Sequence, residues 1–79
     1  MECFIAKRSS NIAKIGYDGE NMVVVFKNGG VYQYDKVPHQ IYESMEHLEE
    51  SESLGKYFIA NVRNNYPCKK LRNPIVIHR

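Results

Sequence analysis

The sequence predicts an α+β fold, a three-stranded antiparallel meander followed by two helices packed on one face of the sheet. Between residues 11 and 35, short runs of strand-forming residues alternate with turn signals at Asp18-Gly19 and Asn28-Gly29. From Pro38 onward, the spacing of apolar residues changes to a helical period. The chain has 79 residues, which is enough for a single domain over 1–79 with one modest core.

Three strands are expected at 11–17, 22–27 and 30–35. The middle segment, "MVVVFK", is rich in β-branched residues, which favour strands. Asn28-Gly29 predicts a two-residue type I′ turn, because both residues tolerate positive φ. The first ten residues carry weaker signals, and Phe4 and Ile5 are expected either to form a short edge strand or to pack on the body.

Two-residue loops at Gly19-Glu20 and Asn28-Gly29 would place Tyr17 opposite Met22 and Val25 opposite Tyr32. One face of the sheet then holds Ala13, Ile15, Tyr17, Met22, Val24, Phe26 and Val31. The other face holds Lys14, Gly16, Val23, Val25, Lys27, Tyr32 and Tyr34. We expect the helices to cover the first face, which leaves Tyr32 and Tyr34 on the second. A slip of one residue in either loop would exchange these sets.

Two helices are expected after Pro38, a residue that suits a first helical turn. The apolar stripe of the first helix consists of Ile41, Tyr42, Met45 and Leu48. The second helix begins after an N-cap at Ser51 or Ser53, and Pro67 ends it. Its apolar positions are Leu54, Phe58, Ile59, Val62 and Tyr66. A short extra C-terminal strand is a further option at 75–77.

The net charge of +2 conceals an uneven distribution. Residues 37–54 contain acids and no Lys or Arg: Glu43, Glu46, Glu49, Glu50 and Glu52. Residues 55–79 contain bases and no acid: Lys56, Arg63, Lys69, Lys70, Arg72 and Arg79. This pattern fits either a basic face that meets phosphate groups or an ordinary surface with a local sign bias.

The composition argues against several classes of protein. The apolar runs "MVVVF" and "IVI" are too short to span a bilayer, and the first residues lack a stretch of signal-peptide length. A cytoplasmic location is therefore expected, with Cys3 and Cys68 reduced, although a bridge between them stays open. Neither catalytic residues nor a metal site or cofactor is expected, because the three histidines are scattered: His39, His47 and His78.

Several segments together resemble the KTSC domain, a short module named from the C-terminus of lysyl-tRNA synthetase. The resemblance covers about 10–66 and rests on "SNIAKIGYD", "MVVVFKNGGVYQYDKVP", "SLGKYF" and "VRNNY", in that order. The family's YxY matches Tyr32 and Tyr34, and its VP step matches Val37-Pro38. The resemblance implies no established activity. Fusion to a tRNA synthetase suggests RNA binding by association, and the basic tail 67–79 lies outside the matched region.

The candidate nucleic-acid-binding residues are two tyrosines and six basic residues. Tyr32 and Tyr34 at i and i+2 could stack unpaired bases, with Lys14 and Lys27 on the same predicted face. The alternative is that both tyrosines pack in the core. Lys56 follows a helix start that could approach a phosphate, and the remaining basic candidates are Arg63, Lys69 and Lys70.

The leading hypothesis is a small non-enzymatic binding module for RNA, either tRNA-like or single-stranded, that uses these residues. The rival hypothesis is a protein-interaction or self-associating module, such as a phage- or plasmid-type adaptor or inhibitor of a host complex. In that case the acidic helix with Glu43, Glu46 and Glu49, or a sheet face, would contact the partner protein. The two hypotheses share a fold and differ in the face that is used.

Overall fold

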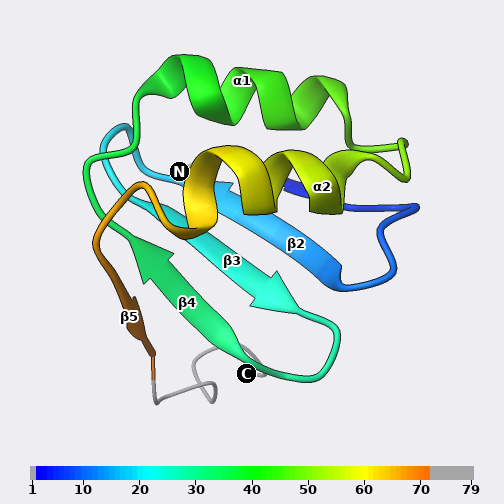
Figure 1. Cartoon of the computed structure of the whole chain (residues 1–79), viewed down its shortest axis with the longest axis horizontal. Coiled ribbons are helices and arrows are strands. Elements are labelled where there is room, and N and C mark those ends of the chain that lie inside the picture. Colours follow the sequence, from blue (N-terminus) through cyan, green and yellow to red (C-terminus); the bar gives the residue numbers. More distant parts are fainter. Residues whose placement is uncertain (1, 72–79) are drawn as a thin grey trace.

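The structure is a computed structural model that describes residues 2–71. Five antiparallel strands form one sheet in the order β1-β2-β3-β4-β5, so each strand pairs with its neighbours in sequence. The strands are β1 (Glu2–Ile5), β2 (Ile12–Tyr17), β3 (Met22–Phe26), β4 (Val31–Tyr34) and β5 (Cys68–Lys70). Two helical segments lie over the same face of this sheet (Figure 1). The α+β class is therefore confirmed, with a sheet two strands wider than predicted.

The first hairpin has the predicted register. Tyr17 pairs with Met22 and Ile15 with Val24, which places all four side chains under the helices. A bulge between Ile12 and Lys14 then brings Ile12, instead of Ala13, onto this face. The edge strand expected around Phe4 is present as β1, which pairs with β2 and places Phe4 opposite Ile15.

The predicted register of the second hairpin is wrong by one residue. Val25 pairs with Val31 and Val24 with Tyr32, where the two-residue turn would have paired Val25 with Tyr32. The loop has three residues, because the Phe26 N–H donates to the Gly30 carbonyl at 2.8 Å, and the Gly29 N–H donates back to Phe26 at 2.9 Å. Gly29 has a φ of +97°, which is typical of a turn followed by a glycine bulge.

This slip moves Tyr32 and Tyr34 to the side of the sheet that faces the helices. Tyr34 is buried in the core with 4% of its surface exposed, and Tyr32 is partly buried against the same cluster. Their predicted placement on the opposite face is therefore wrong. Val31, predicted to lie under the helices, takes the opposite face instead, because side chains alternate along a strand.

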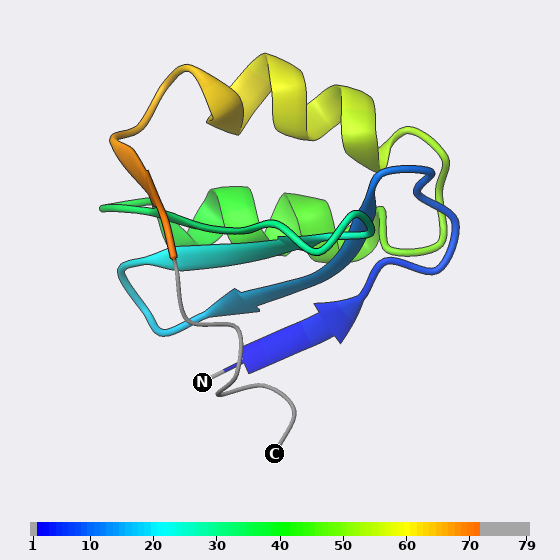
Figure 2. The ribbon, with the colours of Figure 1, turned by 90° about the horizontal axis from the view of Figure 1, so that it is seen from below.

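The last described strand comes from the segment predicted as a basic tail. In β5, Cys68 pairs with Tyr34 and Lys70 with Tyr32 across the edge of the sheet. The Leu71 N–H extends this pairing by donating to the Val31 carbonyl at 2.8 Å. Strands β1 and β5 form opposite edges of the sheet (Figure 2). The strand expected at 75–77 lies outside the described residues.

The helices bury the stripes that their spacing predicted. Helix α1 (His39–His47) buries Tyr42 and Met45, whereas helix α2 (Leu54–Phe58) buries Leu54 and Phe58. A π-helical turn, η1 (Ile59–Arg63), continues α2 and buries Val62. Ser53 precedes α2 without a side-chain capping bond, so the expected serine cap does not form there. Ile59, counted among the apolar positions of this helix, is 50% exposed.

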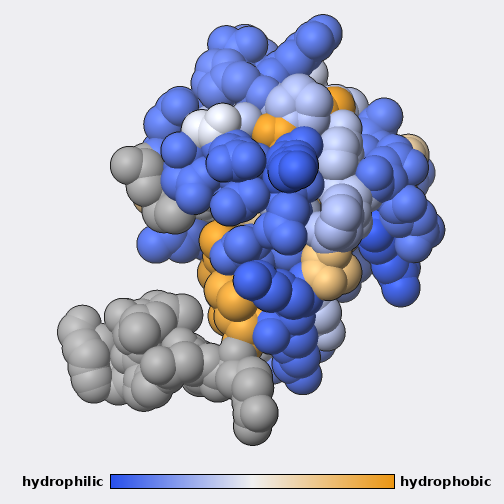
Figure 3. Space-filling model, turned by 90° about the vertical axis from the view of Figure 1, so that its left-hand side faces the viewer, coloured by the Kyte–Doolittle hydropathy of each residue, from blue (hydrophilic) through white to orange (hydrophobic). Residues whose placement is uncertain are grey.

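The opposite face of the sheet carries aliphatic side chains that neither helix covers. Val23 and Val25 are partly buried there, and Ile5 is 57% exposed. Lys14 and Lys69 lie on the same face, opposite Ile5 and Gln33 respectively. The space-filling view shows hydrophobic surface beside the last described residues (Figure 3).

Two buried tyrosines stack between the sheet and α1 but differ in their hydrogen bonding. The rings of Tyr17 and Tyr42 lie 4.9 Å apart and nearly parallel, and both are almost fully buried. The Tyr17 hydroxyl donates to the Val37 carbonyl oxygen. The Tyr42 hydroxyl has no hydrogen-bond partner among the described residues. Burial raises the pKa of both groups, and that of Tyr42 to about 12.

Removing these two hydroxyls is expected to have unequal effects on stability. Tyr17→Phe leaves the Val37 carbonyl without this donor and should lower the free energy of unfolding by about 1–3 kcal/mol. Tyr42→Phe removes a buried group that makes no bond and should be neutral or slightly stabilising. Urea unfolding of both variants measures the difference. An equal loss in the two variants would contradict this assignment of partners.

Candidate nucleic-acid interface

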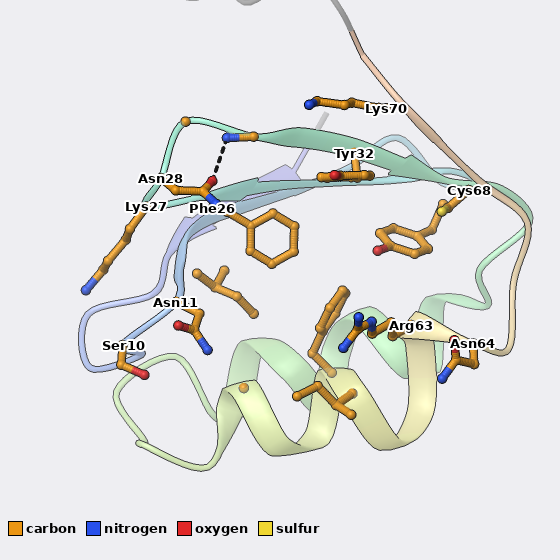
Figure 4. A pocket seen from close by; sticks show the side chains of 17 residues that line it. Ser10, Asn11, Phe26, Lys27, Asn28, Tyr32, Arg63, Asn64, Cys68 and Lys70 are labelled. Atoms are coloured by element: carbon orange, nitrogen blue, oxygen red, sulfur yellow. Dashed lines mark hydrogen bonds between the residues drawn. The ribbon is translucent and has the colours of Figure 1, made fainter.

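A cleft opens between the β3-β4 hairpin on one side and α2 with η1 on the other (Figure 4). Its volume of about 1070 Å³ is slightly above the range of roughly 300–1,000 Å³ that is usual for ligand sites. The lining comes from five parts of the chain: Ser10, Asn11 and Ile12; Phe26 to Gly30; Tyr32 and Tyr34; Gly55, Phe58, Ile59, Arg63 and Asn64; and Cys68 and Lys70.

Four aromatic rings form a continuous wall in this cleft. Phe26 contacts Tyr32 with ring centroids 5.6 Å apart and Phe58 with centroids 5.7 Å apart. Phe58 contacts Tyr34 at 5.5 Å, and all three pairs are edge-to-face. Phe58 and Tyr34 are buried, whereas Phe26 and Tyr32 are only partly buried. The aromatic wall is therefore packed against the core through Phe58 and Tyr34, and it is accessible from the cleft at Phe26 and Tyr32.

The π-helical turn adds Ile59 and Arg63 to the helical side of the cleft, directly after Phe58. Such turns interrupt a regular helix and often occur at functional sites. Amide side chains bond the carbonyl groups around it: Asn61 Nδ2 donates to the Tyr57 carbonyl at 3.1 Å, and Asn65 Nδ2 donates to the Asn61 carbonyl at 2.8 Å. Both Ile59 and Arg63 remain exposed at the cleft.

The lining carries positive charge without a compensating carboxylate. Its ionic side chains are Lys27, Arg63 and Lys70, and no Asp or Glu lines it among residues 2–71. All three bases are exposed. Lys70 is the cross-strand neighbour of Tyr32, so the two residues lie side by side at this edge of the sheet. The described salt bridges lie elsewhere and involve Lys7 and His39.

Tyr34 and Cys68 meet at the β5 end of the cleft. They are paired across the strands, with Cys68 exposed and Tyr34 buried. Burial first, and then the neighbouring Cys68, raises the pKa of Tyr34 to about 12. The phenol is therefore neutral at physiological pH and adds no negative charge to the cleft. Cys3, on β1 at the other edge of the sheet, is also an exposed free thiol.

A glycine keeps the Tyr32 ring close to the start of β4. A Cβ atom at Gly30 would lie 3.3 Å from Tyr32 Cε1 and 3.3 Å from Asn28 Oδ1. That Asn28 oxygen accepts a hydrogen bond from the Gly30 N–H at 2.9 Å, drawn as a dashed line in Figure 4. The hairpin loop therefore fixes both the register of β4 and the position of the tyrosine that borders the cleft.

The structure brings together five of the eight residues proposed from the sequence. Those that line the cleft are Tyr32, Tyr34, Lys27, Arg63 and Lys70. Lys14 and Lys69 lie on the opposite face of the sheet, and Lys56 is exposed on α2 without lining the cleft. Arg72 lies outside the described residues. Sequence reasoning missed Phe26, Phe58 and Ile59 as cleft residues, because their spacing indicated only that they were apolar.

Residues 2–71 contain neither a candidate metal site nor a helix able to span a membrane. No group of three or more His, Cys, Asp or Glu side chains in this part of the chain could hold a metal ion. None of the helices described has the length and apolar character needed to cross a membrane.

Fold and cleft together define the chain as a small α+β domain with a five-stranded antiparallel meander, two helices on one face and a cationic aromatic cleft at one end. The family model of the KTSC domain matches residues 8–66, and the chain belongs to this family. It is similar to the crystal structure of a KTSC domain protein from Yersinia pestis, with 26% identity and a TM-score of 0.73. That match covers 90% of this chain and 97% of the other. No curated protein matches the chain.

Proposed function

We propose that this protein is a small, non-enzymatic, cytoplasmic module that binds single-stranded RNA in the cleft. The observation that carries the proposal is the pairing of Tyr32 with Lys70 inside an aromatic cleft whose charged lining is entirely basic. Single-strand binding sites combine these two features, because rings stack bases and cations neutralise phosphates. The proposal keeps the predicted ligand but moves the site from the outer sheet face to the cleft.

The form of the cleft favours an unpaired strand over a duplex. Phe26 and Tyr32 are recessed between two walls, so a base must leave its stack to reach them. Unpaired bases in loops and single strands are free to do so, whereas bases in a duplex are not. Stacking of a nucleobase on one accessible ring contributes about 1–3 kcal/mol. The neighbouring Lys and Arg side chains add a salt-dependent attraction to the phosphates.

The test is a titration of labelled short single-stranded RNA and bulk tRNA at low and near-physiological salt, read by fluorescence anisotropy. Tyr32→Ala should weaken binding by about 1–3 kcal/mol. Tyr32→Phe, which keeps the ring, should retain most of the affinity. Thermal unfolding of both variants shows whether the fold is intact. Equal RNA affinity in Tyr32→Ala and the parent protein would contradict the proposal.

The two exposed cysteines locate the bound RNA without mutation. Cys68 lines the cleft, whereas Cys3 lies on the far edge of the sheet. Bound RNA should slow alkylation of Cys68 by iodoacetamide and leave the rate at Cys3 unchanged. Mass spectrometry of the two peptides measures both rates in one sample. Protection of neither thiol, or of Cys3 alone, would place the RNA away from the cleft.

A protein-interaction or self-associating module is the second candidate. It is favoured by aliphatic side chains on the outer sheet face. Ile5 is 57% exposed on β1, and Val23 and Val25 are partly buried on β3, across Lys14 of β2. Exposed apolar surface of this kind is common at protein interfaces. The same RNA titration separates the candidates when it is combined with sedimentation. A mass that rises with protein concentration, together with no response to RNA, would favour self-association through this face.

A further inference from the structure

The basic residues of the cleft lie at different ends of its aromatic wall. Figure 4 shows Lys27 at one end and Arg63 at the other, with Phe26 and Tyr32 between them. The backbone at Lys27 is held in place by a hydrogen bond, in which the Lys27 N–H donates to the Asn11 carbonyl at 2.8 Å. At the other end, Arg63 belongs to the π-helical turn. A nucleotide within a strand also carries a phosphate on either side, so this order of charges suits one base with both of its phosphates.

One cleft residue is a glycine for which neither packing nor backbone conformation gives a reason. A Cβ atom at Gly55 would approach only Ser9 Oγ, at an ordinary contact distance of 3.9 Å. Gly55 is also not among the glycines with positive φ. Glycine within a helix is less favourable than alanine. Gly55 lines the cleft, so the missing side chain leaves room there for a ligand to approach the helix closely.

We infer that the cleft holds one unpaired nucleotide with both of its phosphates, and that this nucleotide contacts α2 at Gly55. Its base lies on the Tyr32 side of the cleft. Lys27 contacts one phosphate, and Arg63 contacts the other. This inference rests on the proposed RNA-binding function and adds the unit that is recognised, a nucleoside 3′,5′-bisphosphate within a single strand.

The experiment is displacement of labelled single-stranded RNA from the full chain by uridine, its 5′- and 3′-monophosphates and its 3′,5′-bisphosphate. The bisphosphate should displace RNA at about tenfold lower concentration than either monophosphate, as expected for one additional charge-assisted contact. Lys27→Gln should abolish the gain in affinity that one of the two phosphates, 5′ or 3′, provides. Arg63→Gln should abolish the gain that the other phosphate provides. Lys56→Gln, an exposed base on α2 outside the cleft, should change neither.

A second variant separates binding from stability. Gly55→Ala should raise the midpoint of thermal unfolding, because alanine favours the helix. The same variant should weaken bisphosphate binding about tenfold, since the added methyl group occupies ligand space. A purely structural glycine would not produce these opposite signs. Unchanged bisphosphate affinity in Gly55→Ala would overturn the contact at α2.

The outcomes distinguish this inference from the function on which it rests. RNA that binds and protects Cys68, while all the nucleotides fail to displace it, would overturn the single-nucleotide site and leave RNA binding in place. The inference would also be overturned if Lys27→Gln and Arg63→Gln both removed the gain in affinity from the same phosphate, because both side chains would then contact that one phosphate. Failure of the RNA itself to bind would remove the proposed function.

Discussion

Replacing Phe58 with alanine is expected to lower the free energy of unfolding by about 3–5 kcal/mol, the usual loss for a buried phenylalanine. The Phe58 side chain is 3% exposed and makes edge-to-face contacts with both Phe26 and Tyr34. Its removal leaves a cavity between α2 and the sheet. Because a 79-residue chain has a total stability of roughly 4–12 kcal/mol, this loss is a large fraction of the whole.

Urea unfolding followed by far-ultraviolet circular dichroism measures this loss. The adjacent residue provides the control, because Ile59 is 50% exposed and borders the cleft instead of the core. Ile59→Ala should change the free energy of unfolding by less than about 1 kcal/mol, as is usual for exposed positions. Similar losses in the two variants would contradict the packing of α2 on the sheet that forms the cleft.

Neutralising Arg63 and Lys70 together is expected to weaken RNA binding and to reduce its dependence on salt. For single strands, the logarithm of the binding constant falls with the logarithm of salt concentration by about 0.7 for each phosphate neutralised. If each side chain contacts one phosphate, Arg63→Gln/Lys70→Gln should lower the slope by about 1.4. Anisotropy titrations at four or more salt concentrations give the slope for each protein.

Lys14→Gln/Lys69→Gln is the matched control, because it removes the same charge from the opposite face of the sheet. If the RNA binds in the cleft, the salt dependence of binding should have nearly the same slope for this control variant as for the parent protein. If the two double variants had equal slopes, the attraction would depend on net charge alone and the cleft would not be the site. Circular dichroism should show unchanged folds, since all four bases are exposed.

Helices and the first hairpin could be predicted because local signals there agree with the tertiary structure. The stripe containing Tyr42 and Met45, and the spacing of Leu54, Phe58 and Val62, mark the buried faces of the two helices. The turn after Tyr17 gives the observed pairing with Met22. The family resemblance inferred over about 10–66 also agrees with the matched family model.

The second hairpin shows why a local signal can mislead. Asn28-Gly29 is compatible with a two-residue turn, but also with a three-residue loop in which only Gly29 takes positive φ. The difference of one residue exchanges the two faces of β4. In the folded chain, the longer loop buries Tyr34 against Phe58 and leaves Val31 on the opposite face. Burial of the large ring beneath the helices favours this register.

The sequence by itself determined the class of fold, the apolar faces of both helices and the set of basic residues available to a ligand. Only the tertiary structure decided which of them meet. Lys27, Arg63 and Lys70 come from a hairpin loop, a π-helical turn and an edge strand, and their meeting in one cleft with Tyr32 depends on long-range pairing. Periodicity shows which side of an element is buried, whereas a cleft between elements is set by strand register and helix packing.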